Sequence, residues 1–308
     1  MVSAVLFITF FVLLVLNVPI SICLGLSSAA AILYSGTSLT IVATNIYSGI
    51  SKFLLLAIPF FVLSGNIMAK AGISTRLIRF VDTCVGHRKG GIANVCIIVA
   101  CFFGAISGSG PATVAALGAV LIPAMVERGG FSAPFSTALM ATASSIAIVI
   151  PPSIAFVVYA SITGVSIGDM FMAGIVPGIL MGLALIIVVM LEVRKNHVVP
   201  SNVQKASAKE RLDAFKDAFW GFLMPVIILG GIYGGIFTPT EAAAVAAVYA
   251  FICGVFIFRE LNFGNIYKTI AAACSTNGTT MVIIGCATAF TRVLTLQQIP
   301  AMITQAIL

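Results

Sequence analysis

The sequence predicts an all-α polytopic membrane protein, and three observations lead to this fold class. The chain of 308 residues is 60% hydrophobic and only 8% charged, which is outside the range of soluble domains. Apolar runs long enough to cross a bilayer recur along it. Clusters of proline, glycine and serine interrupt several of these runs, which is typical of the broken helices at transporter binding sites.

The stretch GAISGSGPATVAALGAVLIP is predicted to hold the tip of a re-entrant helical hairpin over residues 91–126. The five residues Ser107 to Pro111 are small or helix-breaking and cannot continue a helix. Each arm has only about 15–17 residues, too few to span a hydrocarbon core of about 30 Å comfortably. The alternative is one long helix with a kink. The polar exit at Glu127 and Arg128 favours the hairpin.

The segments before the hairpin are divided by polarity. Residues 3–35 are apolar with a break at Asn17-Val18-Pro19, so they form either two short helices or one kinked and tilted helix. Residues 36–45 are expected to be a polar connection, and residues 47–70 a membrane span. Residues 71–89 are amphipathic and basic, which indicates an interfacial helix on the membrane surface.

After the hairpin, residues 132–164 form a second over-long apolar run. Ile150-Pro151-Pro152-Ser153 interrupts it, which predicts a broken helix. Composition divides the rest of the chain into a span over 169–192, a polar loop over 193–217, and spans over 218–236, 240–258 and 266–294.

The basic residues predict an orientation. Most of them lie in residues 70–89, 127–130 and 194–216, which fall on one side of the membrane if residues 91–126 form a hairpin. The positive-inside rule makes that side cytoplasmic, including the loop over 193–217. The net charge of +7 therefore reports orientation in a lipid bilayer, and no nucleic acid is expected as a partner.

Neutral oxygen atoms are the candidate ligands of a binding site. Between Gly90 and Gly168 the ionisable side chains, two cysteines and one tyrosine aside, are Glu127 and Arg128 at a surface turn. Hydroxyls and freed carbonyls in such numbers suit a hard monovalent cation, whereas freed helix N-termini suit an anion. This combination suggests sodium-coupled uptake of an anion. The hydroxyl groups concerned belong to Ser107, Ser109, Thr113, Thr142, Ser144, Ser145 and Ser153.

Several alternatives stay open at this stage. Each hydroxyl taken singly is better explained by a bond to its own helix. An intramembrane enzyme with Ser107 or Ser109 as nucleophile would need a base, which this stretch does not offer, and a channel subunit is a further alternative. The seven cysteines form no metal-ligand motif, so no metal other than sodium is expected. LNVPISICLGLSSAAAILYSG weakly echoes GGIYGGIFTPTEAAAVAAVYA, which suggests inverted repeats.

The motifs resemble a known family. GAISGSGPATVAALGAVLIPAM, IVIPPSIAFVVYA and GGIYGGIFTPTEAAAVAAVYA are similar to the large membrane subunit of tripartite ATP-independent periplasmic (TRAP) transporters. The resemblance implies an inverted-repeat, elevator-type transporter of the ion transporter superfamily in the bacterial inner membrane. Sodium would drive import of an organic acid, such as a C4-dicarboxylate or a sialic acid. A soluble periplasmic binding protein would deliver the acid, and a small four-helix membrane subunit would complete the complex.

The resemblance also implies roles for segments and residues. Residues 1–89 would be scaffold with an interfacial arm, residues 90–192 the first half of the transport domain, and residues 218–308 second-repeat scaffold. The family's second hairpin would follow the last residue, so the chain is expected either to be a partial sequence truncated before it or to lack that half of the transport domain. The expected sodium ligands are Ser107, Gly108, Ser109, Ile150, Pro151, Pro152 and Ser153, and the expected substrate contacts are Gly110, Pro111, Thr113, Ser144 and Ser145.

Overall fold

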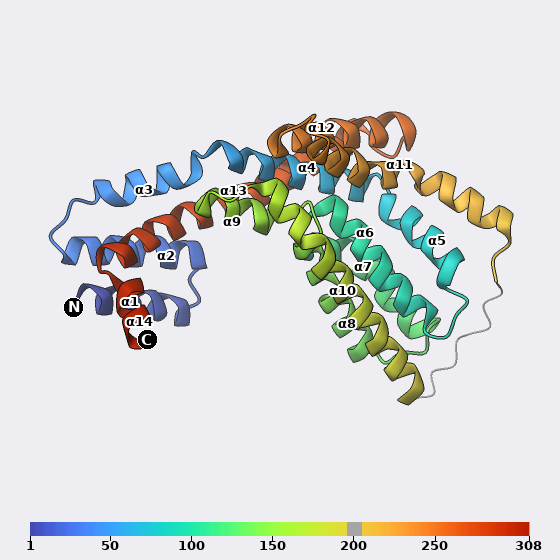
Figure 1. The fold of residues 1–308 in the computed structure, drawn as a ribbon, viewed down its shortest axis with the longest axis horizontal. Coiled ribbons are helices and arrows are strands. Elements are labelled where there is room, and N and C mark those ends of the chain that lie inside the picture. Colours follow the sequence, from blue (N-terminus) through green and yellow to red (C-terminus); the bar gives the residue numbers. More distant parts are fainter. Residues whose placement is uncertain (196–204, 308) are drawn as a thin grey trace. The chain divides into compact units, whose positions relative to one another are not determined.

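The computed structural model describes residues 1–195 and 205–307, and within them it is helical without strands. The chain divides into two compact units (Figure 1). The larger unit consists of residues 56–274, and the smaller unit combines residues 1–55 with residues 275–308. One helix, α13, runs from Phe263 to Leu296 and belongs to both.

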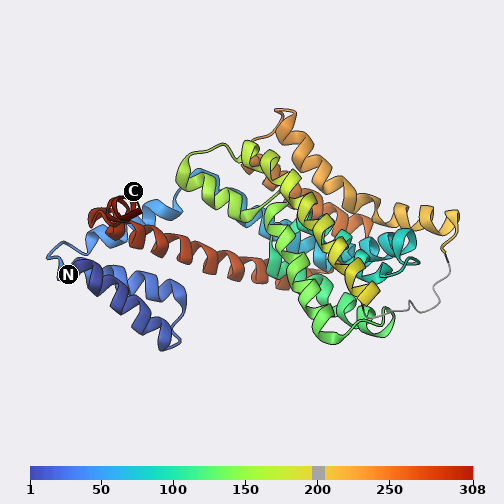
Figure 2. The same cartoon turned by 60° about the horizontal axis from the view of Figure 1, so that its bottom comes forward.

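The larger unit is built around a bundle of helices from the middle of the chain. Helices α6, α7, α8 and α10 run side by side in two views (Figures 1 and 2), and their contacts agree. The helices that the structure describes in this unit before α13 are α4 (Ala57–Lys70), α5 (Ile73–Val85), α6 (Gly91–Ser107), α7 (Gly110–Glu127), α8 (Ala133–Val149), α9 (Ile154–Thr163), α10 (Ile167–Lys195), α11 (Ala208–Tyr233) and α12 (Pro239–Ile252). A π-helical turn over Cys253–Ile257 continues α12.

The smaller unit begins with two short helices rather than one kinked helix. Helix α1 ends at Val15 and α2 begins at Ile20, and Asn17 between them has a left-handed backbone (φ 59°) that a helix cannot contain. The polar connection expected over residues 36–45 is wrong in its second half, because a helix begins at Thr40. The helices and helical turn of this unit, besides α13, are α1 (Val2–Val15), α2 (Ile20–Tyr34), α3 (Thr40–Ile50), η1 (Phe53–Leu56) and α14 (Ile299–Ile307).

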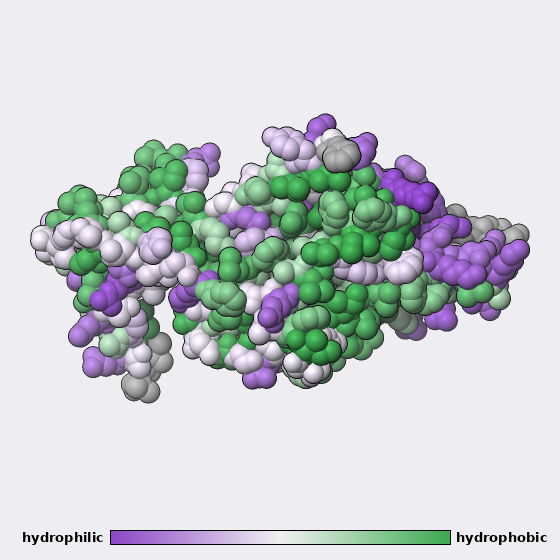
Figure 3. Space-filling view, turned by 90° about the horizontal axis from the view of Figure 1, so that it is seen from above, coloured by the Kyte–Doolittle hydropathy of each residue, from purple (hydrophilic) through white to green (hydrophobic). Residues whose placement is uncertain are grey.

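The membrane class of the chain is confirmed. Six helices among the described residues are long and apolar enough to cross a bilayer, and a seventh span results if α8 and α9 count as one bent helix. Hydrophilic residues gather at the end of the larger unit where α11 begins, and apolar residues cover much of that unit beside them on the face shown in Figure 3. The chain is therefore a polytopic helical membrane protein.

The amphipathic helix expected within residues 71–89 forms, but its apolar face lies on protein. Helix α5 packs on α6 and α11, and Leu77 and Val81 on this face are buried. The ring of Phe80 lies 5.5 Å from that of Phe215 and 5.4 Å from that of Phe222, both on α11. The chain's own helices thus cover the apolar face that amphipathicity alone assigned to the membrane surface.

The polar loop expected over residues 193–217 is also corrected. Helix α10 continues to Lys195, and α11 begins at Ala208. Residues 196–204 lie outside the described residues. Ser207 accepts a hydrogen bond from the backbone N–H of Glu210, and the carboxylate of Glu210 accepts one from the N–H of Ser207. This capping box starts the helix nearly three turns earlier than the span over 218–236 that hydrophobicity indicates.

The three basic segments lie together at one end of the larger unit, as expected. Arg79 of α5 pairs with Asp217 of α11, with 2.8 Å between the nitrogen and the oxygen. Arg128, which follows α7, pairs with Asp82 of α5 at 2.9 Å. We call this region the charged end. Its cytoplasmic location stays a prediction.

The compact units have bounds different from those of the domains expected from the sequence. Helix α12 packs extensively on α4, and α5 packs on both α6 and α11. Residues 56–89 and 218–274 therefore share one unit with residues 90–192. The motion of residues 90–192 relative to a scaffold stays a prediction.

Candidate functional site

The predicted hairpin forms around Ser107, Gly108 and Ser109. Gly108 ends α6 with a left-handed backbone (φ 61°), and its N–H donates to the carbonyl of Gly104 at 2.8 Å. Ser109 caps α7 by accepting a hydrogen bond from the N–H of Ala112, with Pro111 in the first turn. Helices α6 and α7 then pack against each other, so the segment is a hairpin rather than one kinked helix.

The second predicted break forms between α8 and α9. Helix α8 ends at Val149, α9 begins at Ile154, and the two axes are bent by 41°. Ser153 is fully buried and caps α9 by accepting a hydrogen bond from the N–H of Phe156. Its hydroxyl donates to the carbonyl of Ile148. One serine therefore serves a freed carbonyl on one side of the break and a freed N–H on the other.

The two breaks touch each other. The backbone N–H of Ile154 donates to the carbonyl of Gly108 at 3.5 Å. A Cβ atom on Gly108 would collide with the carbonyl oxygen of Pro152, so only glycine fits there. The expected juxtaposition of the tip, Ser107 to Ser109, with the Pro151-Pro152 break is thus present in the structure.

Two hydroxyl groups form a buried network at the hairpin tip. The Oγ atom of Ser107 lies 3.3 Å from the Oγ1 atom of Thr113, and both residues are buried. Thr113 donates to the carbonyl of Ser109 at 2.8 Å, and the N–H of Ser109 lies 3.4 Å from the Oγ atom of Ser107. These groups hold the first turn of α7 against the last turn of α6.

The remaining candidate residues are arranged differently. Ser144 donates to the carbonyl of Ala141 at 2.7 Å, and the half-buried Ser145 donates to that of Thr142 at 2.6 Å. These are the bonds within one helix that explain a single hydroxyl without a binding site. Pro111 is exposed. A Cβ atom on Gly110 would lie 3.2 Å from the carbonyl oxygen of Ser144, so α7 begins against α8.

Small residues that sequence reasoning did not single out bring the helices of the site together. A Cβ atom on Gly65 of α4 would lie 2.9 Å from the Cα atom of Ser107, and one on Gly104 would lie 2.7 Å from the Cα atom of Ala147 on α8. Such contacts require residues without a side chain at helix interfaces. The only sequence signal is a glycine within an apolar helix, which does not identify its partner.

The comparison with protein families decides the family. A model described as "Tripartite ATP-independent periplasmic transporter, DctM component" matches residues 7–308. The chain belongs to the DctM family. The resemblance inferred from the hairpin and break motifs is therefore confirmed.

Several curated members of the DctM family are similar along most of the chain. The isethionate TRAP transporter permease protein DctMQ of Oleidesulfovibrio alaskensis is 45% identical over 305 residues, which are 99% of this chain and 48% of the relative. The C4-dicarboxylate TRAP transporter large permease protein DctM of Pseudomonas aeruginosa is 44% identical over 280 residues (90% and 64%). Its namesake from Vibrio cholerae is 46% identical over 263 residues (85% and 57%).

The names of these DctM relatives bear on the class of protein. The chain spans between about half and two-thirds of the length of these relatives. All three are named as transporter permeases, so the chain is a transporter component and not an enzyme. This outcome agrees with the lack of a candidate base beside Ser107 and Ser109 in the sequence.

Proposed function

We propose that the chain is part of a sodium-coupled secondary transporter that imports a small organic anion. The contact between the two helix breaks carries this proposal. It brings together the ends of α6 and α8 and the beginnings of α7 and α9. Helix C-termini attract a cation and helix N-termini attract an anion, so this one place can bind both.

The helix caps support an anion at this place. Helices α7 and α9 begin with the neutral caps Ser109 and Ser153, and neither has an acidic residue in its first turn. By contrast, Glu210 and Glu241 in capping boxes complement the N-termini of α11 and α12. The partial positive charges of α7 and α9 are therefore left for a bound anion.

The sodium site that we propose joins the two breaks. Its oxygen ligands are the hydroxyls of Ser107 and Ser109 and the backbone carbonyls around Gly108 and between Ile150 and Ser153. Neutral oxygens of this kind suit a hard monovalent cation. A sodium ion there would hold the hairpin on the neighbouring broken helix, which makes anion binding sodium-dependent by linkage.

The substrate is proposed to bind beside the ion, near Gly110, Pro111, Thr113, Ser144 and Ser145. Isethionate and C4-dicarboxylates, named for the relatives, are both small organic anions. We propose that a periplasmic binding protein delivers the anion, that a small membrane subunit completes the complex in the bacterial inner membrane, and that transport follows an elevator motion.

The test is uptake of a C4-dicarboxylate, with isethionate in parallel, by the complete transporter in vesicles. We expect uptake to require a sodium gradient and the binding protein. Ser109→Ala should raise the sodium concentration for half-maximal uptake about threefold, because one hydroxyl oxygen is lost while carbonyl ligands remain. Pro152→Ala should raise it more, because the helix can then close and withdraw its carbonyls.

The control variant is Thr137→Ala on α8, whose exposed hydroxyl donates to the carbonyl of Ala133 outside the site. It should keep the parental sodium dependence. Uptake that persists without sodium, or without the binding protein, would contradict the proposed coupling. Parental sodium dependence in both Ser109→Ala and Pro152→Ala would contradict the proposed site.

A further inference from the structure

The charged end holds a cavity of about 330 Å³ between α5 and the start of α11. This volume falls at the lower end of small-molecule sites. Polar and charged side chains dominate its lining, which consists of Arg79, Asp82, Thr83, His87, Lys205, Ala206 and Glu210.

Each carboxylate that lines the cavity accepts one hydrogen bond from the protein. Asp82 accepts through Oδ2 from Arg128 at 2.9 Å, while its Oδ1 atom is buried without a hydrogen-bond partner, and Glu210 accepts through Oε2 from the N–H of Ser207 at 2.7 Å. Among the described residues Lys205 forms no ion pair, and the Nδ1 atom of His87 is buried without a hydrogen-bond partner. The cavity therefore retains the ammonium group of Lys205 as a donor for an added acceptor, beside the unpaired Oδ1 atom of Asp82.

A neighbouring guanidinium group also lacks an acceptor. Arg211 follows the lining residue Glu210 on α11, and its Nε and Nη2 atoms are buried with no hydrogen-bond partner in the described part of the chain. Buried donors of a charged group are costly when unpaired. This second observation points to an anionic ligand in the same region.

Aromatic side chains indicate where the cavity lies relative to the membrane interface. Phe222 of α11 lies 5.0 Å from Phe102 of α6 between ring centres, and Phe219 lies 5.7 Å from Trp220, which is 39% exposed. Exposed tryptophan and its aromatic neighbours mark the membrane interface. Asp217, the partner of Arg79, precedes Trp220 by three residues, or about 4.5 Å along a helix. The Arg79 side of the cavity is thus level with lipid headgroups.

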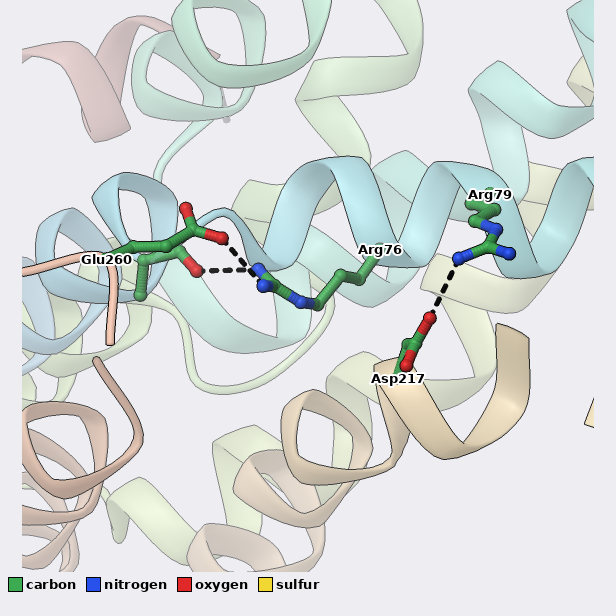
Figure 4. Close-up of polar contacts among 5 residues, drawn as sticks. Arg76, Arg79, Asp217 and Glu260 are labelled. Carbon is green, nitrogen blue, oxygen red and sulfur yellow. Dashed lines mark hydrogen bonds and ion pairs between the residues drawn. The ribbon is translucent and has the colours of Figure 1, made fainter. Parts of the chain in front are cut away.

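We propose that this cavity binds the phosphate group of an anionic phospholipid. Arg79 at headgroup level, together with Lys205 and His87, supplies the contacts to the phosphate oxygens. Figure 4 shows Arg79 directed toward Asp217 from α5, so Asp217 holds this guanidinium in place. The exposed rings of Phe219 and Trp220 favour a lipid over a soluble phosphate, because they offer an apolar surface to acyl chains.

The test measures thermal unfolding of the purified protein in detergent while phosphatidylglycerol is added. Phosphatidylcholine serves as the zwitterionic comparison and inorganic phosphate as the soluble one. We expect phosphatidylglycerol to raise the unfolding temperature saturably, because a ligand bound only by the folded state stabilises it. Lys205→Gln should raise the half-saturating phosphatidylglycerol concentration about tenfold, the effect of one lost charge-assisted hydrogen bond.

The matched control is Lys209→Gln, which removes the same charge from an exposed position on α11 that does not line the cavity. Phosphatidylglycerol should act on this variant as on the parent. The proposal is overturned if both variants respond alike, if phosphatidylcholine stabilises as well as phosphatidylglycerol, or if inorganic phosphate reproduces the shift. His87→Gln provides a second cavity variant, and a parental response in both cavity variants is equally decisive against the site.

Discussion

The larger unit holds two polar regions that are built in opposite ways. At the hairpin, neutral groups are buried and backbone lies on backbone, as Gly108 does on Pro152. At the charged end, long side chains from α5 reach their partners through partly exposed ion pairs, as Arg79 reaches Asp217. The contact at the hairpin requires a residue without a Cβ atom, whereas the charged end is held by pairs of charged side chains.

The difference determines how each region responds to substitution. A close backbone contact has no room for an added methyl group, and a packed interior does not absorb one without displacement. An exposed ion pair is screened by solvent, and its loss costs little. Substitutions that add volume at the hairpin should therefore outweigh those that remove charge at the other end.

The largest loss of folding stability and of uptake is expected for Gly108→Ala. A left-handed alanine costs about 1–2 kcal/mol, and the collision with the Pro152 carbonyl adds about 1–3 kcal/mol. Uptake by the complete transporter should be lost. Gly164→Ala is the control, because Gly164 is also left-handed (φ 77°) but a Cβ atom there meets nothing within 4 Å. Equal unfolding temperatures and equal uptake in the two variants would show that the contact of the breaks is not needed.

A somewhat smaller loss of folding stability is expected for Gly65→Ala. The new methyl group would press on the backbone of Ser107 and push α4 from the hairpin, at about 1–3 kcal/mol. Gly230→Ala is the control within a helix, because nothing lies within 4 Å of its added methyl group. That variant should be stabilised by up to about 1 kcal/mol through helix propensity. Thermal unfolding of both variants checks the opposite signs, and the same sign in both would refute the expected crowding.

Ser153→Ala should destabilise the protein by about 1–2 kcal/mol. It removes the cap of α9 and also the donor to the carbonyl of Ile148, at a fully buried position. Ser132→Ala removes a cap of the same kind from α8 at an exposed position, so about 1 kcal/mol or less is expected. Chemical denaturation of the two variants measures the free energy of unfolding that each substitution removes. A larger loss in Ser132→Ala would contradict the double role of Ser153.

The smallest losses of folding stability are expected for substitutions that break the ion pairs of α5. Arg79→Gln should cost less than about 1 kcal/mol, because both partners are about half exposed. Arg76→Gln should cost more, since Arg76 bonds Glu260 at 2.6 Å (Figure 4). Arg76 also donates to the carbonyl of Ala71 and lies over the ring of Phe258. Unfolding at low and high salt distinguishes them, and a salt-independent loss in Arg79→Gln would rule out its electrostatic origin.

The sequence identified both helix breaks because glycine and proline act on the backbone locally. Ser107-Gly108-Ser109 and Pro151-Pro152 interrupt their helices wherever those helices pack. The early start of α11 was also encoded, since Ser207 and Glu210 have the spacing of a capping box. Charged residues make up most of residues 208–217, so hydrophobicity alone does not reveal the helix there.

Other features depend on partners that are distant in sequence. The apolar stripe of α5 shows that something covers it, but periodicity does not distinguish a lipid surface from α11. Gly65 and Ser107 touch only because α4 and the hairpin are packed together. Contacts of this kind follow from tertiary packing, which one sequence does not reveal.

The packing of α4 on α12 has a consequence for the time course of synthesis. Between the end of α4 at Lys70 and the start of α12 at Pro239 the ribosome adds about 170 residues. At about 5–20 residues per second this takes about 10–30 seconds. During that interval the part of α4 that α12 covers has not yet met its permanent neighbour. The nascent chain must keep this part in lipid or on a chaperone until α12 emerges.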